Sequence, residues 1–198
     1  MAASLILAST SPYRRQLLRQ LGLPFEAVAP DYEEQIDQQV SPELLVKHLA
    51  TGKARSLAER FPQSLIIGAD QVFVDPRGRI LGKPGTLAAA RRQLQQMAGK
   101  KHTFYTGVTL FDARNGRLQS DFVPFTVTLR ALSSEQIARY VEREQPVDCA
   151  GAFKIEGLGI ALMASMEGED YTALIGLPLL RLTDMLLQFG VDPLSSCS

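Results

Sequence analysis

The sequence predicts an α/β fold with a mixed sheet flanked by helices. In the first half of the chain, short apolar runs alternate with segments whose apolar residues recur every three or four positions, which indicates strands alternating with amphipathic helices. In the second half, Asn115-Gly116 lies between two long apolar-rich segments, the signal of a β-hairpin. Because a hairpin pairs its strands antiparallel, the sheet is expected to be mixed rather than fully parallel.

Helix starts in the first half are marked by a capping hydroxyl followed by proline. Ser11-Pro12 predicts a helix that Gly22 ends, and Ser41-Pro42 predicts a second one to about Arg60. Thr86 can cap a third helix running to Met97. The other elements expected here are strands over 4–8, 23–28 and 65–74, a polar loop over 31–39 and a turn over 76–79.

The second half is expected to begin with the hairpin and to end with a helix. Ser133 and Gln136 form a capping box, which predicts a helix to about Arg143. The remaining expectations are strands over 104–111, 122–129 and 160–163, a glycine-punctuated segment over 151–159 and an amphipathic helix over 179–189. We therefore expect a single domain over 1–191 and a flexible tail over 192–198.

Composition excludes several classes of protein. The chain has 198 residues, 45% of them hydrophobic, so it can bury a core without disulfide staples. Twenty-one basic residues balance twenty-one acidic ones, so no overall field would hold a nucleic acid. Two cysteines do not make a disulfide framework, and no apolar run is long enough for a membrane span. A cytoplasmic protein without nucleic-acid or membrane partners is expected.

A first candidate site is the turn that joins the first strand to the first helix. Ser9 and Ser11 supply hydroxyl donors, Arg14 supplies a charged one, and a helix start attracts phosphate. Basic residues in a first helical turn oppose the helix dipole, which favours an anion nearby. The alternative is an ordinary capped helix with solvated arginines.

Asp70 and Lys83 are two further candidates. Asp70 leaves an apolar strand, and a buried carboxylate needs a cation, by preference a divalent metal; the alternative is a solvated strand end. Lys83 stands between Gly82 and Pro84, a setting suited to a phosphate oxygen but also typical of a surface turn.

Weaker signals come from other charged residues. Glu33 and Glu34 in the acidic loop could ligate a metal, although a solvated loop accounts for them better. Lys53 could face a site from its helix, although a solvated lysine is the usual case. His48 and His102 lack a second ligand at metal spacing, so a zinc site is not expected.

Six motifs taken together resemble the Maf family of nucleotide pyrophosphatases, in the family's order over residues 4–190. They are the segments Leu7–Arg15, Gly68–Val72, Gly82–Pro84, Tyr105–Val108, Cys149–Lys154 and Gly176–Leu179. The resemblance implies the inosine-triphosphatase type of fold (Maf/Ham1), a long bent mixed sheet with a cleft between two lobes. It also implies Mg²⁺- or Mn²⁺-dependent cleavage of a small nucleotide between its α and β phosphates.

The resemblance also implies roles for particular residues. Asp70 would be the proton acceptor and a metal ligand, together with Glu34 or its neighbour Glu33. The phosphates would be held by Ser9, Arg14, Lys53 and Lys83. A homodimer is plausible for this kind of fold.

In the family that this chain resembles, three positions contact the base, and the residues found there in this chain resemble one branch. Tyr13, Gln71 and Glu156 resemble the 7-methyl-GTP pyrophosphatase branch rather than the dTTP and UTP branch. N7-methylguanine is cationic, so Tyr13 can stack on it, and Glu156 can accept hydrogen bonds from its N–H groups. Two alternatives remain open, a dTTP or UTP pyrophosphatase of the same family and a non-catalytic nucleotide-binding regulator of cell division.

Overall fold

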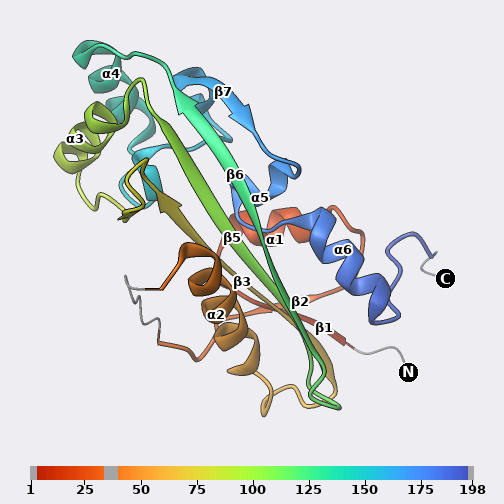
Figure 1. Ribbon diagram of the computed structural model, residues 1–198. Coiled ribbons are helices and arrows are strands. Elements are labelled where there is room, and N and C mark those ends of the chain that lie inside the picture. Colours follow the sequence, from red (N-terminus) through yellow and green to blue (C-terminus); the bar gives the residue numbers. More distant parts are fainter. Residues whose placement is uncertain (1–3, 34–39, 196–198) are drawn as a thin grey trace. The chain divides into compact units, whose positions relative to one another are not determined.

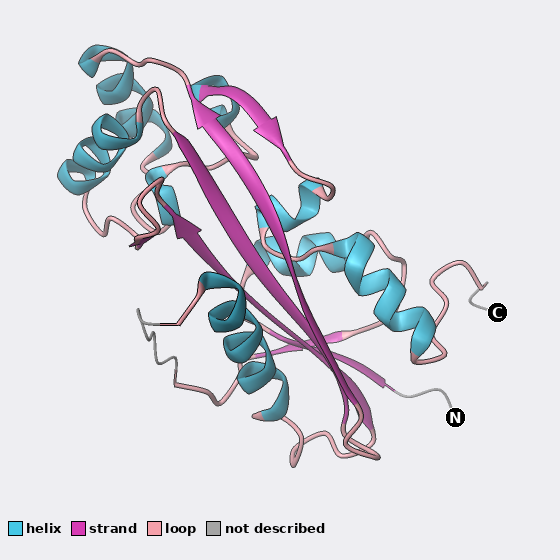
Figure 2. Ribbon diagram, in the orientation of Figure 1, coloured by secondary structure: helices cyan, strands magenta, loops and turns pink. Residues whose placement is uncertain are grey.

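The computed structural model describes residues 4–33 and 40–195, and in them helices flank a seven-stranded mixed sheet (Figure 2). The strand order is β2-β1-β3-β5-β6-β7, and β4 pairs with β3 outside this path. β1 is parallel to β2 and β3, whereas β4 and β7 run antiparallel to their partners. The mixed α/β fold predicted from the sequence is confirmed.

The elements follow one another along the chain as labelled in Figure 1. The strands are β1 Ser4–Ala8, β2 Glu26–Val28, β3 Ser64–Val74, β4 Ile80–Leu81, β5 Lys101–Asp112, β6 Leu118–Leu129 and β7 Met163–Glu167. The helices are α1 Pro12–Arg19, α2 Pro42–Arg55, α3 Leu87–Met97, α4 Ser134–Glu144, α5 Tyr171–Ile175 and α6 Leu179–Gln188, with 3₁₀ turns η1 Ala150–Ala152 and η2 Leu158–Leu162. None of the helices in the described residues is long and apolar enough to cross a bilayer.

The chain divides into two compact units. The first comprises Met1–Gln71, Tyr105–Val123 and Asp170–Ser198, and the second comprises Val72–Phe104 and Pro124–Glu169. β3, β5 and β6 each contribute residues to both units.

The structure confirms the predicted helix starts. They could be predicted from the sequence because a cap bonds to a residue only a few positions away. Ser11 Oγ accepts a hydrogen bond from the Arg14 amide at 3.4 Å, and Ser41 Oγ accepts one from the Leu44 amide at 3.5 Å. Ser133 forms the expected capping box, with both reciprocal bonds to Gln136 present. Each cap satisfies an N–H group that the helix leaves without a partner.

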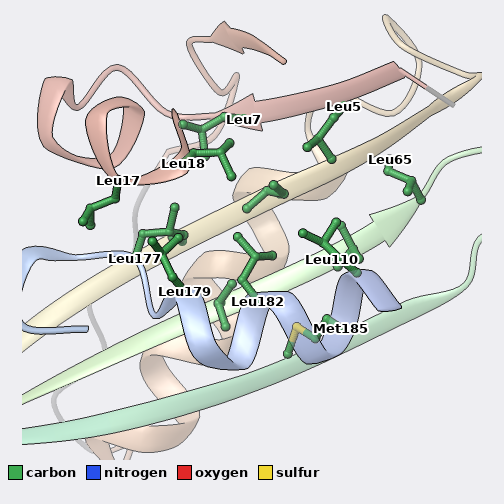
Figure 3. Packing of buried hydrophobic residues seen from close by; sticks show 14 residues of the cluster. Leu5, Leu7, Leu17, Leu18, Leu65, Leu110, Leu177, Leu179, Leu182 and Met185 are labelled. Carbon is green, nitrogen blue, oxygen red and sulfur yellow. The ribbon is translucent and has the colours of Figure 1, made fainter. Parts of the chain in front are cut away.

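The first unit has an apolar layer on each face of its strands. Leu5 and Leu7 of β1 pack with α1 and α6 on one face, where leucines from all three elements converge (Figure 3). Ile6 and Ala8 point to the other face and pack with Ala54 of α2. Successive side chains of a strand point to opposite faces, so β1 is buried on both.

α2 lies in direct contact with β3 at Gly68. A Cβ at Gly68 would come within 2.0 Å of the Ala50 carbonyl oxygen, a distance that no side chain permits. Glycine at this position therefore allows the helix to pack on the strand. The close packing holds the last turn of α2 beside the middle of β3.

The second unit has an aromatic cluster and a pair of packed helices. Phe73 lies with its ring centroid 4.3 Å from that of Phe104 and 5.9 Å from that of Phe153, and His102 stacks on Phe73 at 5.4 Å. α3 contacts α4, as Figure 1 shows.

Two expectations about element boundaries are wrong. The strand predicted over 160–163 is a 3₁₀ turn through Leu162, and β7 begins at Met163. Here Gly157 and Gly159 both donate to the Lys154 carbonyl, which turns the chain before the strand can begin. α2 ends at Arg55, five residues earlier than expected. The short elements β4 and α5 were not predicted, because two and five residues show no periodicity.

Candidate active site

Asp70 and Lys53 form a buried ion pair in the first unit. β3 carries Asp70 and the last turn of α2 carries Lys53, whose ammonium donates a hydrogen bond to Asp70 Oδ1. Their side chains are only 10% and 8% exposed. The cation that the sequence requires beside Asp70 is therefore supplied, in this structure, by Lys53.

A divalent metal remains compatible with Asp70. No residue that the structure describes donates a hydrogen bond to its Oδ2, which leaves a carboxylate oxygen of the kind that Mg²⁺ and Mn²⁺ bind. Within residues 4–33 and 40–195, no group of three or more His, Cys, Asp or Glu side chains could hold a metal. Glu34 lies outside the described residues, whereas Glu33 is described and exposed. Because Mg²⁺ is often held by one or two carboxylates plus substrate phosphates, the donor set fits.

The loop that is predicted to bind phosphate is held by hydrogen bonds within the chain. Ser9 is buried, and its Oγ accepts from the Ser11 amide at 3.2 Å. Arg14 is half-buried, and its Nε donates to the Gly176 carbonyl at 2.8 Å. This contact ties the first turn of α1 to the turn that follows α5.

Gln71 is held against the end of α5. Its Nε2 donates to Thr106 Oγ1 at 2.9 Å, to the Ala173 carbonyl at 2.9 Å and to the Leu174 carbonyl at 3.1 Å. Tyr13, the other predicted specificity residue of this unit, lies in α1 and is 37% exposed.

The predicted residues of the first unit fall on two faces of β3. Asp70 points to the face covered by α2, while Gln71 points to the opposite face, toward α5. Arg14 contacts the turn after the same helix, so it belongs with Gln71. The structure thus brings Asp70 together with Lys53, and Arg14 and Gln71 together with α5. The cleft predicted to unite them with Lys83 stays a prediction.

Lys83 and Glu156 belong to the second unit, and both are exposed. The loop that carries Lys83 is held by a hydrogen bond from Gln93 Nε2 to the Gly82 carbonyl at 3.1 Å and by one from the Gly85 amide to the Val147 carbonyl at 2.9 Å. Glu156 lies between η1 and η2, in a loop that the Leu158 amide fastens to Glu144 Oε1 at 3.0 Å.

A separate hollow of about 380 Å³ in the second unit is not lined by any predicted site residue. Its charged lining includes Arg77, Lys100 and the ion pair of Arg79 with Asp75. Burial opposes ionisation of Asp75, but hydrogen bonds from Arg79 and Arg77 hold its pKa below the ordinary value. Burial lowers the pKa of His102 in the same wall.

Two buried polar residues of the site were missed from the sequence. Thr106 is fully buried and donates to the Ala173 carbonyl at 2.8 Å. Asp170 caps α5 through the Thr172 amide at 2.8 Å and also accepts from the Leu180 amide of α6 at 2.9 Å. Asp-x-Thr before an apolar run is a capping signal that the sequence offers, whereas Thr106 stands out only as part of the Tyr105–Val108 motif, which does not reveal its hydrogen bonds.

Fold and site together define an α/β protein with a buried lysine–carboxylate pair and a serine–arginine loop at a helix start. A sequence profile described as Maf-like protein matches residues 4–189, and the chain belongs to this family. The family resemblance predicted from the six motifs is confirmed.

Several similar proteins carry one name. A protein of Syntrophotalea carbinolica named 7-methyl-GTP pyrophosphatase is 62% identical over 187 residues, which cover 94% of this chain and 95% of that protein. Proteins with the same name from Pseudomonas aeruginosa and Pseudomonas fluorescens are 54% and 53% identical, each over 95% of this chain and 97% of its own length.

Proposed function

We propose that this chain is a nucleotide pyrophosphatase that hydrolyses 7-methyl-GTP to 7-methyl-GMP and diphosphate. The observation that carries the proposal is 62% identity, over nearly the whole of both chains, to a protein named for that activity. The buried Asp70–Lys53 pair supports it, since a protein that only binds nucleotides has no need of a general base.

In the proposed mechanism, Asp70 takes the proton from the attacking water. Lys53 donates a hydrogen bond to the buried Asp70 carboxylate and compensates its charge, because burying an uncompensated charge is costly. Ser9, Arg14 and Lys83 bind the phosphates and, with Lys53, offset negative charge on the leaving diphosphate. A divalent cation held by Asp70 and Glu34 would supply Lewis-acid activation of the phosphate and the water.

Base recognition is assigned to Tyr13, Gln71 and Glu156. The N7-methylguanine ring is cationic, and an aromatic face attracts a cation. Tyr13 is exposed enough to stack on such a ring, and Glu156 is an exposed carboxylate able to accept from its N–H donors. The same groups do not suit the neutral pyrimidines, which is why UTP and dTTP are expected to be poorer substrates.

A panel of nucleotides tests the activity and its selectivity. Diphosphate release would be measured from 7-methyl-GTP, GTP, ATP, UTP and dTTP, with Mg²⁺, with Mn²⁺ and with a chelator. We expect metal-dependent release, with the highest kcat/KM for 7-methyl-GTP. A preference for UTP or dTTP would support the other branch of the family, and binding without release would support the non-catalytic regulator.

Cytoplasmic location and a homodimer complete the proposal. The cysteine content, two residues in 198, supports a reducing compartment. Leu180 and Leu187 are 62% and 50% exposed and lie seven residues apart on α6, on one stripe of the helix, which supports self-association. Light scattering at several concentrations measures the oligomeric state.

A further inference from the structure

Two backbone carbonyl groups near the end of helix α5 accept hydrogen bonds from side chains of β3 and β5. The Ala173 carbonyl accepts from Thr106 Oγ1 at 2.8 Å and from Gln71 Nε2 at 2.9 Å, and the Leu174 carbonyl accepts from the same Nε2 at 3.1 Å. The last carbonyls of any helix have no partner within it, and a helix of five residues has few internal bonds to spare. Gln71 and Thr106 therefore complete the end of α5.

These contacts determine the orientation of the Gln71 amide, that is, which position is Nε2 and which is Oε1. Turning the amide over would direct its oxygen at two backbone carbonyl oxygens, which offer no proton. Thr106 adds a third constraint. Because its single hydroxyl proton goes to Ala173, its oxygen can only accept, and Gln71 Nε2 is the donor at 2.9 Å.

Gln71 Oε1 is consequently an acceptor in a fixed orientation. In the part of the chain that the structure describes, no group donates a hydrogen bond to it, and the Gln71 side chain is half-buried. Thr106 itself is fully buried, so it cannot reach a ligand and acts through Gln71.

We infer that Thr106 is a positioning residue for base recognition: together with the Ala173 and Leu174 carbonyls it holds Gln71 as a hydrogen-bond acceptor, and so favours a base that presents a donor at N1, as guanine does. The inference rests on the proposed function, which gives Gln71 its contact with the base. Guanine presents N1–H and a 2-amino group on its Watson–Crick edge. Adenine presents a 6-amino donor there but an acceptor at N1, which would meet Gln71 Oε1 acceptor to acceptor. A site with a buried polar group left unpaired rejects the mismatched analogue.

Substitution of Thr106 separates positioning from packing. Thr106→Val keeps the shape of the side chain but removes the hydroxyl. One of the three acceptors that hold the Gln71 amide is then lost, and the amide is held less firmly in the orientation in which its oxygen accepts. We expect the ratio of kcat/KM for 7-methyl-GTP over ATP to fall about tenfold, the factor that one ordinary hydrogen bond is worth. Thr106→Ser keeps the hydroxyl and is expected to restore the ratio.

Thr109→Val is the matched control. Thr109 lies three residues further along β5, is equally buried, and bonds through its hydroxyl to Ser120 at 2.8 Å and Thr51 at 3.1 Å. The ratio should stay at the wild-type value in this variant. An equal loss with both nucleotides in Thr106→Val, or the same change of ratio in Thr109→Val, would overturn the inference, since a purely structural role predicts those results.

Binding provides a readout without turnover. The ratio of dissociation constants for 7-methyl-GMP and AMP, measured by calorimetry, should shift in the same direction and by a similar factor. A wild-type chain that discriminates the monophosphates but releases no diphosphate would refute the proposed activity while leaving the positioning role testable on the binding ratio alone. If Thr106→Val does not fold, Gln71→Met removes the acceptor itself, and an unchanged ratio in that variant overturns the inference.

Discussion

Asp70 and Lys53 each depend on the other, because both side chains are nine-tenths buried and neither charge has bulk water to stabilise it. Removing one partner of such a pair leaves an uncompensated charge, which commonly costs about 3–5 kcal/mol. The pair therefore contributes to the fold as well as to the proposed chemistry. A substitution of Asp70 is therefore expected to change stability as well as turnover, and both have to be measured.

Asp70→Asn is expected to lower turnover about a hundredfold or more and also to lower the unfolding temperature. The loss of turnover follows from the missing general base, and the loss of stability from the broken ion pair with Lys53. Diphosphate release and thermal unfolding would be followed on the same preparation. Wild-type turnover in this variant would contradict the assignment of Asp70 as base.

The double variant Lys53→Met/Asp70→Asn separates the two effects. It removes both charges, so much of the lost stability should return while turnover stays low. Recovery of activity together with stability would mean that Asp70 matters only for folding.

At the scale of elements, the position of α2 on β3 decides whether the ion pair can form. Lys53 and Asp70 are 17 residues apart in the chain and meet only because the helix contacts the strand at Gly68. The caps that start α2 and α4 are legible in the sequence, because Ser41 and Ser133 act on residues three positions away. The packing of α2 on β3 could not be predicted in the same way, because it depends on the backbone of another element.

Gly68→Ala should destabilise the fold by about 1–3 kcal/mol or more and reduce turnover. The added Cβ would meet the Ala50 carbonyl at 2.0 Å, so the last turn of α2 and Lys53 must shift away from Asp70. Denaturant unfolding and diphosphate release measure the two effects. Gly82→Ala is the control for stability, because a Cβ there meets nothing within 4 Å; equal destabilisation by both variants would contradict the steric explanation.

At the scale of the whole molecule, carboxylates in both units are held ionised by arginines. In the β5–β6 hairpin, Asp112 accepts from Arg114 Nη2 at 2.7 Å and Nε at 2.8 Å, and these hydrogen bonds lower the pKa of Asp112. Asp75 in the second unit is held ionised by Arg79 in the same way. Each carboxylate is more acidic in the folded chain than in the unfolded one.

Stability should therefore fall in acid. A carboxyl group with a lowered folded-state pKa stabilises the fold above its unfolded pKa, about 3.9 for Asp, and the contribution is lost as the pH falls through the folded value. Asp112→Asn should cost about 1–2 kcal/mol at pH 7 and flatten the fall in unfolding free energy below about pH 4. Asp184→Asn, at an exposed position of α6, should leave the acid profile unchanged. A wild-type acid profile in Asp112→Asn would contradict this account.

The local features could be predicted from the order of the residues alone: the capped starts of α1, α2, α3 and α4, the Asn115-Gly116 turn, the apolar strands and, through six motifs, the family. These depend on residues within a few positions of one another, so a linear reading contains the necessary information. The folded chain was needed to show that Lys53 neutralises Asp70, that Asp70 and Gln71 lie on opposite faces of β3, and that Thr106 is one of the groups that hold the Gln71 amide. Those contacts join residues from 17 to 102 positions apart. They form because helices packed on the sheet exclude water, so each buried polar group is hydrogen-bonded to a partner in another element.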